Sequence, residues 1–462
     1  MSTIGRNKIF IKWAVNVLIP IIVYFFPETE LFTASFKGFL AVTLFGILML
    51  AFDLVPSLVA AIIFPVGYAL LNVAPLATVL GSWTSTTAFV VLCGFWLAVI
   101  LIRIKLLDRI ICNLATKFTG SFFGIALTIY IAGIIASFVT FGGHQVLILA
   151  FAFGACKAMN LKPGIEATVL MTAALYTCIY AQIFSYYPGV LSLLNGAIAS
   201  VDANYTITWL SNLLLGLPMF FVGVIGIFIL CKIFARNIKG ADIKETYEKK
   251  LAELGKMSSD EKKAIFIVCL LFLFLITSNI HKIPSDYGII ITPLLFYLPG
   301  INIGKADDTT RINYDMVFLI LGCMGIGAAG SYIGLGEILS TYVVPLLDGT
   351  GAIGLILFVY LFAVIFNFML TPFAVYAAFG AAFASIAYSM GINPAVVMIT
   401  MIIAGDTIFL PYEHNSGLMA YAFGMTSMKD FFKTNFVKSV IQAIAVIGIM
   451  LPYWSLTGML YV

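Results

Sequence analysis

Apolar segments long enough to cross a lipid bilayer follow one another along almost the whole chain, and they limit its fold more than any other feature. Each is about 15–25 residues long, and none alternates polar with apolar residues. Peptide groups without hydrogen bonds are costly in hydrocarbon, so only helices and closed barrels cross a membrane. The lack of alternation excludes a barrel, and a composition of 62% hydrophobic and 10% charged residues excludes a soluble fold. We therefore expect an all-α polytopic membrane protein of about 11 spans.

Charge and cysteine usage exclude several other classes of protein. The net charge of +4 is ordinary for a membrane protein, and no basic stretch with interleaved aromatic residues indicates nucleic-acid binding. Seven cysteines lie scattered in apolar segments without a CxxC spacing, so we expect neither a metal site nor a cofactor. Arg6, Lys8 and Lys12 precede an apolar stretch that lacks a small-residue cleavage site, and many more spans follow. We interpret this stretch as the first helix of a multi-pass protein in the bacterial inner membrane.

The two halves of the chain repeat one another. Leu92-Cys93-Gly94 and Ile320-Leu321-Gly322 are 228 positions apart. The same spacing separates two pairs of glycines, Gly189 from Gly417 and Gly196 from Gly424. Duplicated apolar halves with corresponding Gly/Pro interruptions are typical of secondary transporters that bind substrate where the repeats meet. A channel would need a filter-like ring motif and an enzyme would need a nucleophile with its base, and neither pattern is visible.

These repeats predict the organisation of the chain. We expect two inverted repeats, each with a re-entrant hairpin and a broken helix. The first half, 1–235, is expected to hold a hairpin at 77–104 and a broken helix at 121–158. The second half, 264–462, is expected to hold a hairpin at 314–337 and a broken helix at 352–390. Between them, the lysine-rich segment 236–263 has acid–base pairs at i,i+4 and is predicted to be a cytoplasmic linker.

The C-terminal part of the chain resembles a known family. Its motifs are Gly405 to Pro411, then Asn415, then Tyr421 to Gly424 and Phe431 to Lys438. They are similar to the divalent anion/sodium symporter family of di- and tricarboxylate transporters. The resemblance implies secondary active transport of a small organic anion, most simply a di- or tricarboxylate, by alternating access, and a homodimer in the lipid bilayer.

Two departures from that family leave the coupling ion and the substrate open. The family carries a Ser-Asn-Thr triplet at each hairpin tip, which binds a substrate carboxylate and helps to form a sodium site. Here the corresponding positions are Gly142-Gly143-His144 and Leu370-Thr371-Pro372. The alternatives are a proton-coupled or exchange transporter of another solute, such as an amino acid or sulfate, and, with less support, a channel or membrane enzyme.

Breaks in apolar helices are the expected substrate site, because a helix that stops inside the membrane exposes N–H groups at one new end and C=O groups at the other. The substrate-binding candidates are Gly142, Gly143, His144, Gln145, Thr371, Pro372, Glu413, His414, Asn415 and Ser416. The candidates for lining a cavity or binding a coupling ion are Thr86, Thr87, Gln182, Asn367, Asp406, Thr407 and Pro411.

Two histidines and one glutamate are the ionisable residues among the substrate-binding candidates. Two of the three histidines, His144 and His414, fall at corresponding breaks of the two halves. Because histidine titrates near physiological pH, it suits proton coupling or exchange better than sodium coupling. Glu413 would repel an anion if it were ionised in the site, and a substrate with a cationic group would remove that conflict.

Overall fold

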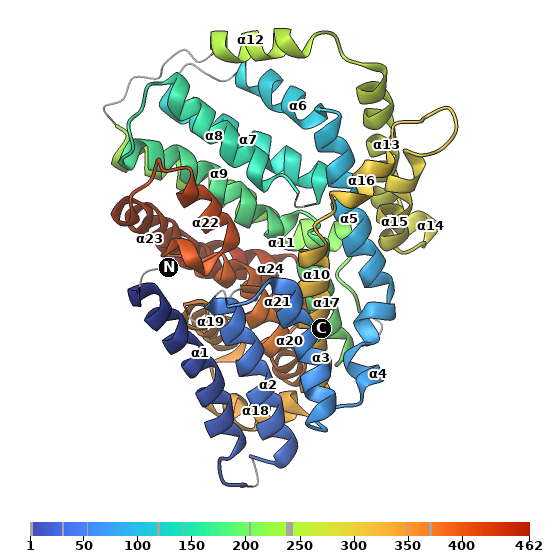
Figure 1. Cartoon of the computed structure of the whole chain (residues 1–462), viewed down its shortest axis with the longest axis vertical. Helices are drawn as coiled ribbons and strands as arrows, with labels where there is room; N and C mark the ends of the chain where they lie inside the picture. The colour runs from blue at the N-terminus through green and yellow to red at the C-terminus, as the bar shows by residue number, and fades with distance from the viewer. Residues whose placement is uncertain are drawn as a thin grey trace.

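The structure is a computed structural model that consists of helices and their connections (Figure 1). It describes residues 3–29, 32–52, 54–117, 121–141, 143–202, 205–236, 244–347, 349–368 and 372–462. In these ranges there is no strand, only an isolated bridge between Ile392 and Tyr461. The prediction of an all-α fold is therefore confirmed.

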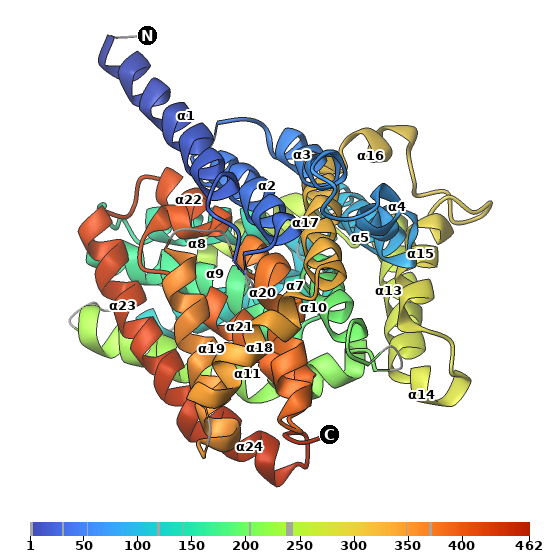
Figure 2. The same ribbon diagram turned by 90° about the horizontal axis from the view of Figure 1, so that it is seen from below.

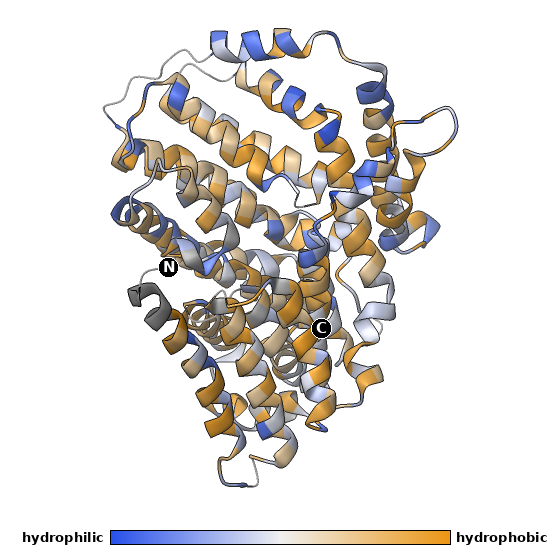
Figure 3. Ribbon diagram, in the orientation of Figure 1, coloured by the Kyte–Doolittle hydropathy of each residue, from blue (hydrophilic) through white to orange (hydrophobic). Residues whose placement is uncertain are grey.

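Apolar helices dominate the structure, as the hydropathy colouring in Figure 3 shows. Within the described ranges, five candidate spans are long and apolar enough to cross a membrane: Phe122–Thr140, Ile165–Ala199, Trp209–Phe234, Tyr314–Tyr332 and Met428–Leu456. Seven further apolar helices are 10–17 residues long. The chain is thus a multi-pass membrane protein, while the number of about 11 spans stays a prediction.

The N-terminal helices form an outer layer. Helix α1 (Thr3–Tyr24) packs along α2 (Ala34–Ala51), and its first turns project from the body of the molecule (Figure 2). Helix α3 (Ser57–Leu70) packs against α17 (Tyr314–Tyr332). A Cβ atom at Gly322 of α17 would lie 2.5 Å from the carbonyl oxygen of Ala61. Glycine is therefore required there for the two helices to approach so closely.

Two series of helices then follow the same order. The first consists of α5 (Thr86–Arg103), α6 (Leu106–Ala115), α7 (Phe122–Thr140), α8 (Gln145–Ala158), α9 (Ile165–Phe184), α10 (Pro188–Ala199) and α11 (Trp209–Phe234). The second consists of α17, α18 (Leu335–Leu346), α19 (Gly351–Asn367), α20 (Pro372–Ser389), α21 (Pro394–Gly405), α22 (Asn415–Ala422) and α23 (Met428–Ala445). The starts of α5 and α17 lie 228 positions apart, and those of α7 and α19 lie 229 apart. Residues Lys105 and Gly334, at φ 60° and 72°, join α5 to α6 and α17 to α18 in the same left-handed conformation.

The helical hairpins lie elsewhere than the sequence predicted. Helix α7 runs parallel to α9. Tyr130 of α7 packs against Tyr176 of α9, and seven residues later Ser137 contacts Ser185, which directly follows α9. Helix α8 runs the other way, because its Cys156 contacts the start of α9 and its Gln145 lies beside Cys178 near the end. The chain therefore reverses between α7 and α8, and the two helices form a hairpin. In the second half, α19 and α20 also run antiparallel, since Phe358 faces Phe383 and Phe362 faces Phe379.

The segments predicted as hairpins form other structures. In 77–104, α4 (Leu76–Val79) and a 3₁₀ turn, η1 (Gly81–Thr84), precede the continuous helix α5. In 314–337, α17 is continuous through its glycines, which serve close packing rather than a chain break. The broken helices are instead α9–α10, interrupted at 185–187, and α21–α22, interrupted at 406–414.

A charged segment connects the two series. Helix α12 (Lys244–Leu254) lies beside α6 at one end of the molecule, and α13 (Ser259–Ile276) follows it (Figure 1). The remaining elements before α17 are α14 (Ser278–His281), α15 (Ser285–Leu295) and α16 (Ala306–Thr310). Arg109 of α6 pairs with Glu261 at an Nε–Oε1 distance of 2.5 Å. Since both side chains are buried, this ion pair fixes the connection to the first series.

Candidate functional site

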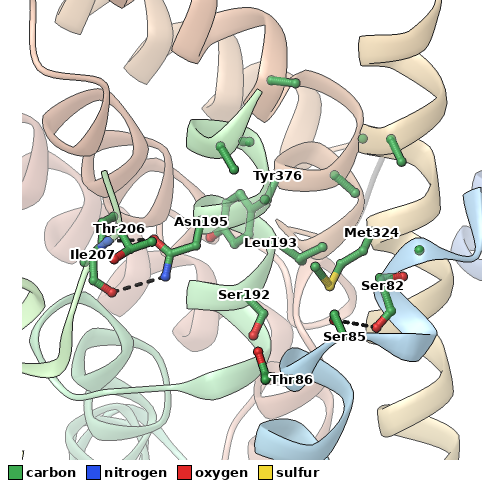
Figure 4. A pocket seen from close by; sticks show the side chains of 18 of the residues that line it. Ser82, Ser85, Thr86, Ser192, Leu193, Asn195, Thr206, Ile207, Met324 and Tyr376 are labelled. Atoms are coloured by element: carbon green, nitrogen blue, oxygen red, sulfur yellow. Dashed lines mark hydrogen bonds between the residues drawn. The ribbon is translucent and has the colours of Figure 1, made fainter. Parts of the chain in front are cut away.

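A cavity of about 610 Å³ lies between α5, α10, α17 and α20 (Figure 4). Its walls carry many hydroxyl groups: Thr78, Ser82, Ser85, Thr86, Ser192, Thr206, Thr208, Ser285 and Ser331. Among the described residues that line it, Asp286 is the one charged side chain. The cavity therefore offers mainly neutral hydrogen-bond donors and acceptors to a ligand.

The polar groups of the cavity are held in defined positions. The amide of Asn195 donates to the carbonyl of Ile207 at 3.1 Å and accepts its N–H at 2.7 Å. Across the cavity, the hydroxyls of Ser192 on α10 and Thr86 at the start of α5 point toward each other (Figure 4). The hydroxyl of Tyr186 donates to Asp286 Oδ1 at 2.9 Å. Such fixed groups can bind a small polar solute without large rearrangement.

The break between α9 and α10 adjoins this cavity. Ser185, in the break, shares a hydrogen bond of 2.9 Å with Ser137, and its carbonyl accepts from the Asn212 amide at 3.1 Å. The next residue, Tyr186, lines the cavity. The interrupted backbone is thus stabilised by side chains on one side and opens to the cavity on the other.

The tip of the first hairpin lies against α5, whose first residue lines the cavity. A Cβ atom at Gly143 would lie 2.4 Å from the Cβ of Ala98 on α5, so the tip is packed as closely as glycine allows. The buried His144 ring bonds through Nε2 to the Thr177 carbonyl at 3.2 Å, which makes Nε2 the donor. The adjacent Cys178 also lies next to Ser416, the second residue of α22. The tip of the first hairpin and the break between α21 and α22 therefore meet on α9.

In the break between α21 and α22, polar side chains accept hydrogen bonds from nearby backbone N–H groups. Glu413 accepts the N–H groups of Phe409 at 3.2 Å and Leu410 at 2.9 Å. His414 accepts the N–H of Ser416 through Nδ1 at 3.1 Å and thereby caps α22. A ring nitrogen that accepts a hydrogen bond carries no proton, so the His414 ring is neutral in this conformation.

The C-terminal end of α21 stops in the interior, where three of its carbonyls are satisfied by side chains from other helices. Gln442 donates to the carbonyl of Ile403 at 3.4 Å, and Asn367 donates to that of Gly405 at 3.3 Å. The ammonium of Lys438 donates to the carbonyl of Asp406. These contacts tie α19, α21 and α23 together at the break.

The predicted residues occupy several different places. Thr86 is the one member of the predicted set found among the described residues that line the cavity. Gln182 bonds within α9 to the Cys178 carbonyl at 3.1 Å, and Thr407 shares a hydrogen bond of 3.0 Å with Tyr360. Pro372 and Pro411 begin α20 and the turn η2 (Pro411–Glu413). Gly142 and Thr371, and the side chains of Thr87 and Asn415, lie outside the described residues.

Four residues of the site are absent from the predicted set. Tyr186, Asp286 and Tyr376 line the cavity, and Lys438 lies at the end of α21. Lys438 had a signal, since it is an ionisable residue followed by an apolar C-terminal stretch, and ionisable residues in membrane segments are rare and usually functional. The other three had none, because they reach the cavity only through the packing of separate helices.

The histidines yield a testable prediction. Replacing His414 by alanine removes the cap of α22, which costs about 1 kcal/mol. We expect His414→Ala to lower the initial rate of transport about fivefold, whereas His414→Asn, which can keep the cap, stays near wild type. His144→Ala, which loses the bond to Thr177, should impair transport as well. Normal kinetics in both alanine variants, measured in proteoliposomes, would remove the histidines from the site.

Two solved structures resemble this chain along nearly its whole length. One is the YdaH transporter of Alcanivorax borkumensis, with 14% sequence identity, a TM-score of 0.57 and 98% of each chain covered. The other is MtrF of Neisseria gonorrhoeae, described as illuminating a class of antimetabolite efflux pumps. It has 14% identity and a TM-score of 0.56, and the match covers 96% of this chain and 94% of that one. At such identity, the likeness shows a shared fold. No curated protein matches the chain.

The family is shown by the sequence as a whole. Residues 7–460 match the family described as the sodium:sulfate symporter transmembrane region. This match extends the resemblance of the C-terminal motifs to almost the full chain, and it confirms that resemblance. The chain belongs to the sodium:sulfate symporter family of multi-pass membrane transporters.

Proposed function

We propose that the protein is a secondary transporter that moves a small organic anion, a di- or tricarboxylate, by alternating access. The observation that carries this proposal is the cavity of about 610 Å³, which extends to Tyr186 in the break between α9 and α10. A volume of this size suits one small solute. No covalent chemistry is involved, since the protein supplies only donors, acceptors and helix ends.

An anion would find its partners at the start of α5. Ser85 and Thr86 cap and begin this helix of 18 residues, and both line the cavity. The N-terminus of a helix carries partial positive charge and unpaired N–H groups. Together with the hydroxyl of Ser192 on the opposite wall, it provides donors for a carboxylate without a basic side chain.

A second candidate substrate is a zwitterion such as an amino acid. It is favoured by Asp286, the one charged side chain among the described lining residues. Tyr186 donates to one oxygen of this carboxylate, and an ammonium group could bind to it as well. For an anion the same carboxylate is unfavourable, so the two substrate classes make opposite demands on Asp286.

Uptake by the purified protein in proteoliposomes tests the transport function. We expect saturable uptake of labelled succinate or citrate, and competition by the unlabelled compound, when succinate, citrate, sulfate and aspartate are compared under an imposed pH gradient. The proposal fails if none of the four solutes is taken up or exchanged. Ion flux at channel-like rates would then support a channel.

Replacing Asp286 by asparagine separates the two substrate classes. For an anionic substrate, loss of the negative charge should leave KM unchanged or lower it. For a zwitterion, loss of the partner for the ammonium group should raise KM at least about tenfold, as expected for a charged hydrogen bond of about 1.5–3 kcal/mol. Asp315→Asn, at an exposed position, is the matched control. A rise in KM for succinate or citrate would contradict the anion assignment.

A further inference from the structure

Lys438 is a fully buried cation in the middle of the apolar helix α23. Its Nζ lies over the rings of Tyr176 and Tyr180 of α9, 5.5 and 5.6 Å from their centroids. Within the described part of the chain, no carboxylate oxygen comes within 4.0 Å of it. The ammonium is therefore held by a carbonyl oxygen and two aromatic faces rather than by a close ion pair.

The groups around this ammonium are a backbone carbonyl and two carboxyl groups, those of Asp406 and Glu413. Its hydrogen-bond acceptor is the carbonyl of Asp406 at the C-terminal end of α21, where the helix dipole places partial negative charge. The side chain of Asp406 is 1% exposed, and its Oδ2 has no hydrogen-bond partner. Glu413 lies close enough to interact with Lys438 electrostatically, and the neutral His414 lies near it too.

A helix cap alone does not explain a lysine at this position. The neighbouring carbonyls of Ile403 and Gly405 are capped by the neutral amides of Gln442 and Asn367. An amide would satisfy the carbonyl of Asp406 as well, without the cost of burying a charge. The ammonium must therefore supply positive charge as such.

The C-terminal end of α21 also lies close to the cavity, with Tyr376 between them. Tyr376 of α20 lines the cavity wall. A Cβ atom at Gly405 would lie 2.1 Å from the Tyr376 hydroxyl, so this hydroxyl lies directly against the end of α21. A single side chain thus separates the cavity from the residue before Asp406.

We propose that Lys438 is a tethered cation that takes the place of a coupling sodium ion at the end of α21. Carbonyl oxygens at the C-terminal end of an interrupted membrane helix are ligands for a monovalent cation, and here the protein's own ammonium bonds to such a carbonyl, that of Asp406. The inference rests on the proposed transport function for its consequence: substrate moves without sodium. Its physical content, that Lys438 excludes sodium from this place, is independent of any substrate.

The melting temperature of the detergent-purified protein tests this inference. We compare wild type, Lys438→Ala and the exposed-site control Lys433→Ala in sodium chloride and in potassium chloride at equal concentration. Wild type and the control should melt at the same temperature in both salts. Lys438→Ala frees the carbonyl oxygen of Asp406 for a sodium ion. This variant should therefore melt about 2 °C higher in sodium chloride than in potassium chloride at saturating salt.

Two results would overturn the inference: a sodium-specific rise in wild type, or a folded Lys438→Ala without one. If Lys438→Ala does not fold, Lys438→Ser, which adds a hydroxyl oxygen, replaces it under the same criterion. In proteoliposomes, wild-type uptake should be equal in sodium and in choline, and stimulation by sodium would also overturn the proposal. Because the melting assay uses no substrate, its failure is distinguishable from a failure of the transport function.

Discussion

The end of α21 inside the protein imposes the constraint on which the rest of the site depends. All twelve residues of this helix are buried, and its last carbonyls lie where no water can solvate them. Unpaired peptide groups in such surroundings are costly, so a helix can stop there only if other elements supply donors. Asn367 from α19, together with Lys438 and Gln442 from α23, meets this requirement. The break thereby fixes the positions of the second hairpin and of α23.

The first half also has a buried helix break whose polar groups need hydrogen-bond partners, but fewer groups are involved. The break between α9 and α10 is short, and Asn212 and Ser137 satisfy its backbone and hydroxyl groups. Here the donors are neutral. The two repeats thus use the same architecture with different chemistry, because the second break also holds the buried groups Asp406, Glu413 and Lys438. Under the proposed function, we expect coupling to involve the second break and the solute to reach the first break.

The sequence predicts the framework better than the site. Apolar length and the spacing of 228 positions predict the helical class and the repeated order, because burial in lipid leaves few alternatives. The sequence predicts the hairpins in the wrong segments because a glycine can mark either a chain break or a close contact between helices. Gly322 of α17 permits close contact with α3, whereas Gly143 packs the connection between α7 and α8 against α5.

The roles of single residues depend on contacts that no local pattern contains. Glu413 looks like an obstacle to an anion, yet in the structure it caps two N–H groups of its own turn. Lys438 follows Asp406 by 32 positions, and only the packing of α23 on α9 and α21 brings the two together. The cavity draws on α4, α5, α10, α15, α17 and α20, so most of its lining cannot be inferred from neighbours in the sequence.

The central claim is that the solute occupies the cavity between α10 and α5, in front of the helix breaks. Protection of a cysteine placed at Ser192 tests it most directly, in a background where the exposed Cys269 is replaced by serine. A small methanethiosulfonate reagent should label Ser192→Cys, and a saturating transported solute should slow the labelling severalfold. A cysteine at the exposed Lys256 should react at the same rate with and without solute. Equal labelling of Ser192→Cys in the presence and absence of every transported solute would contradict the account.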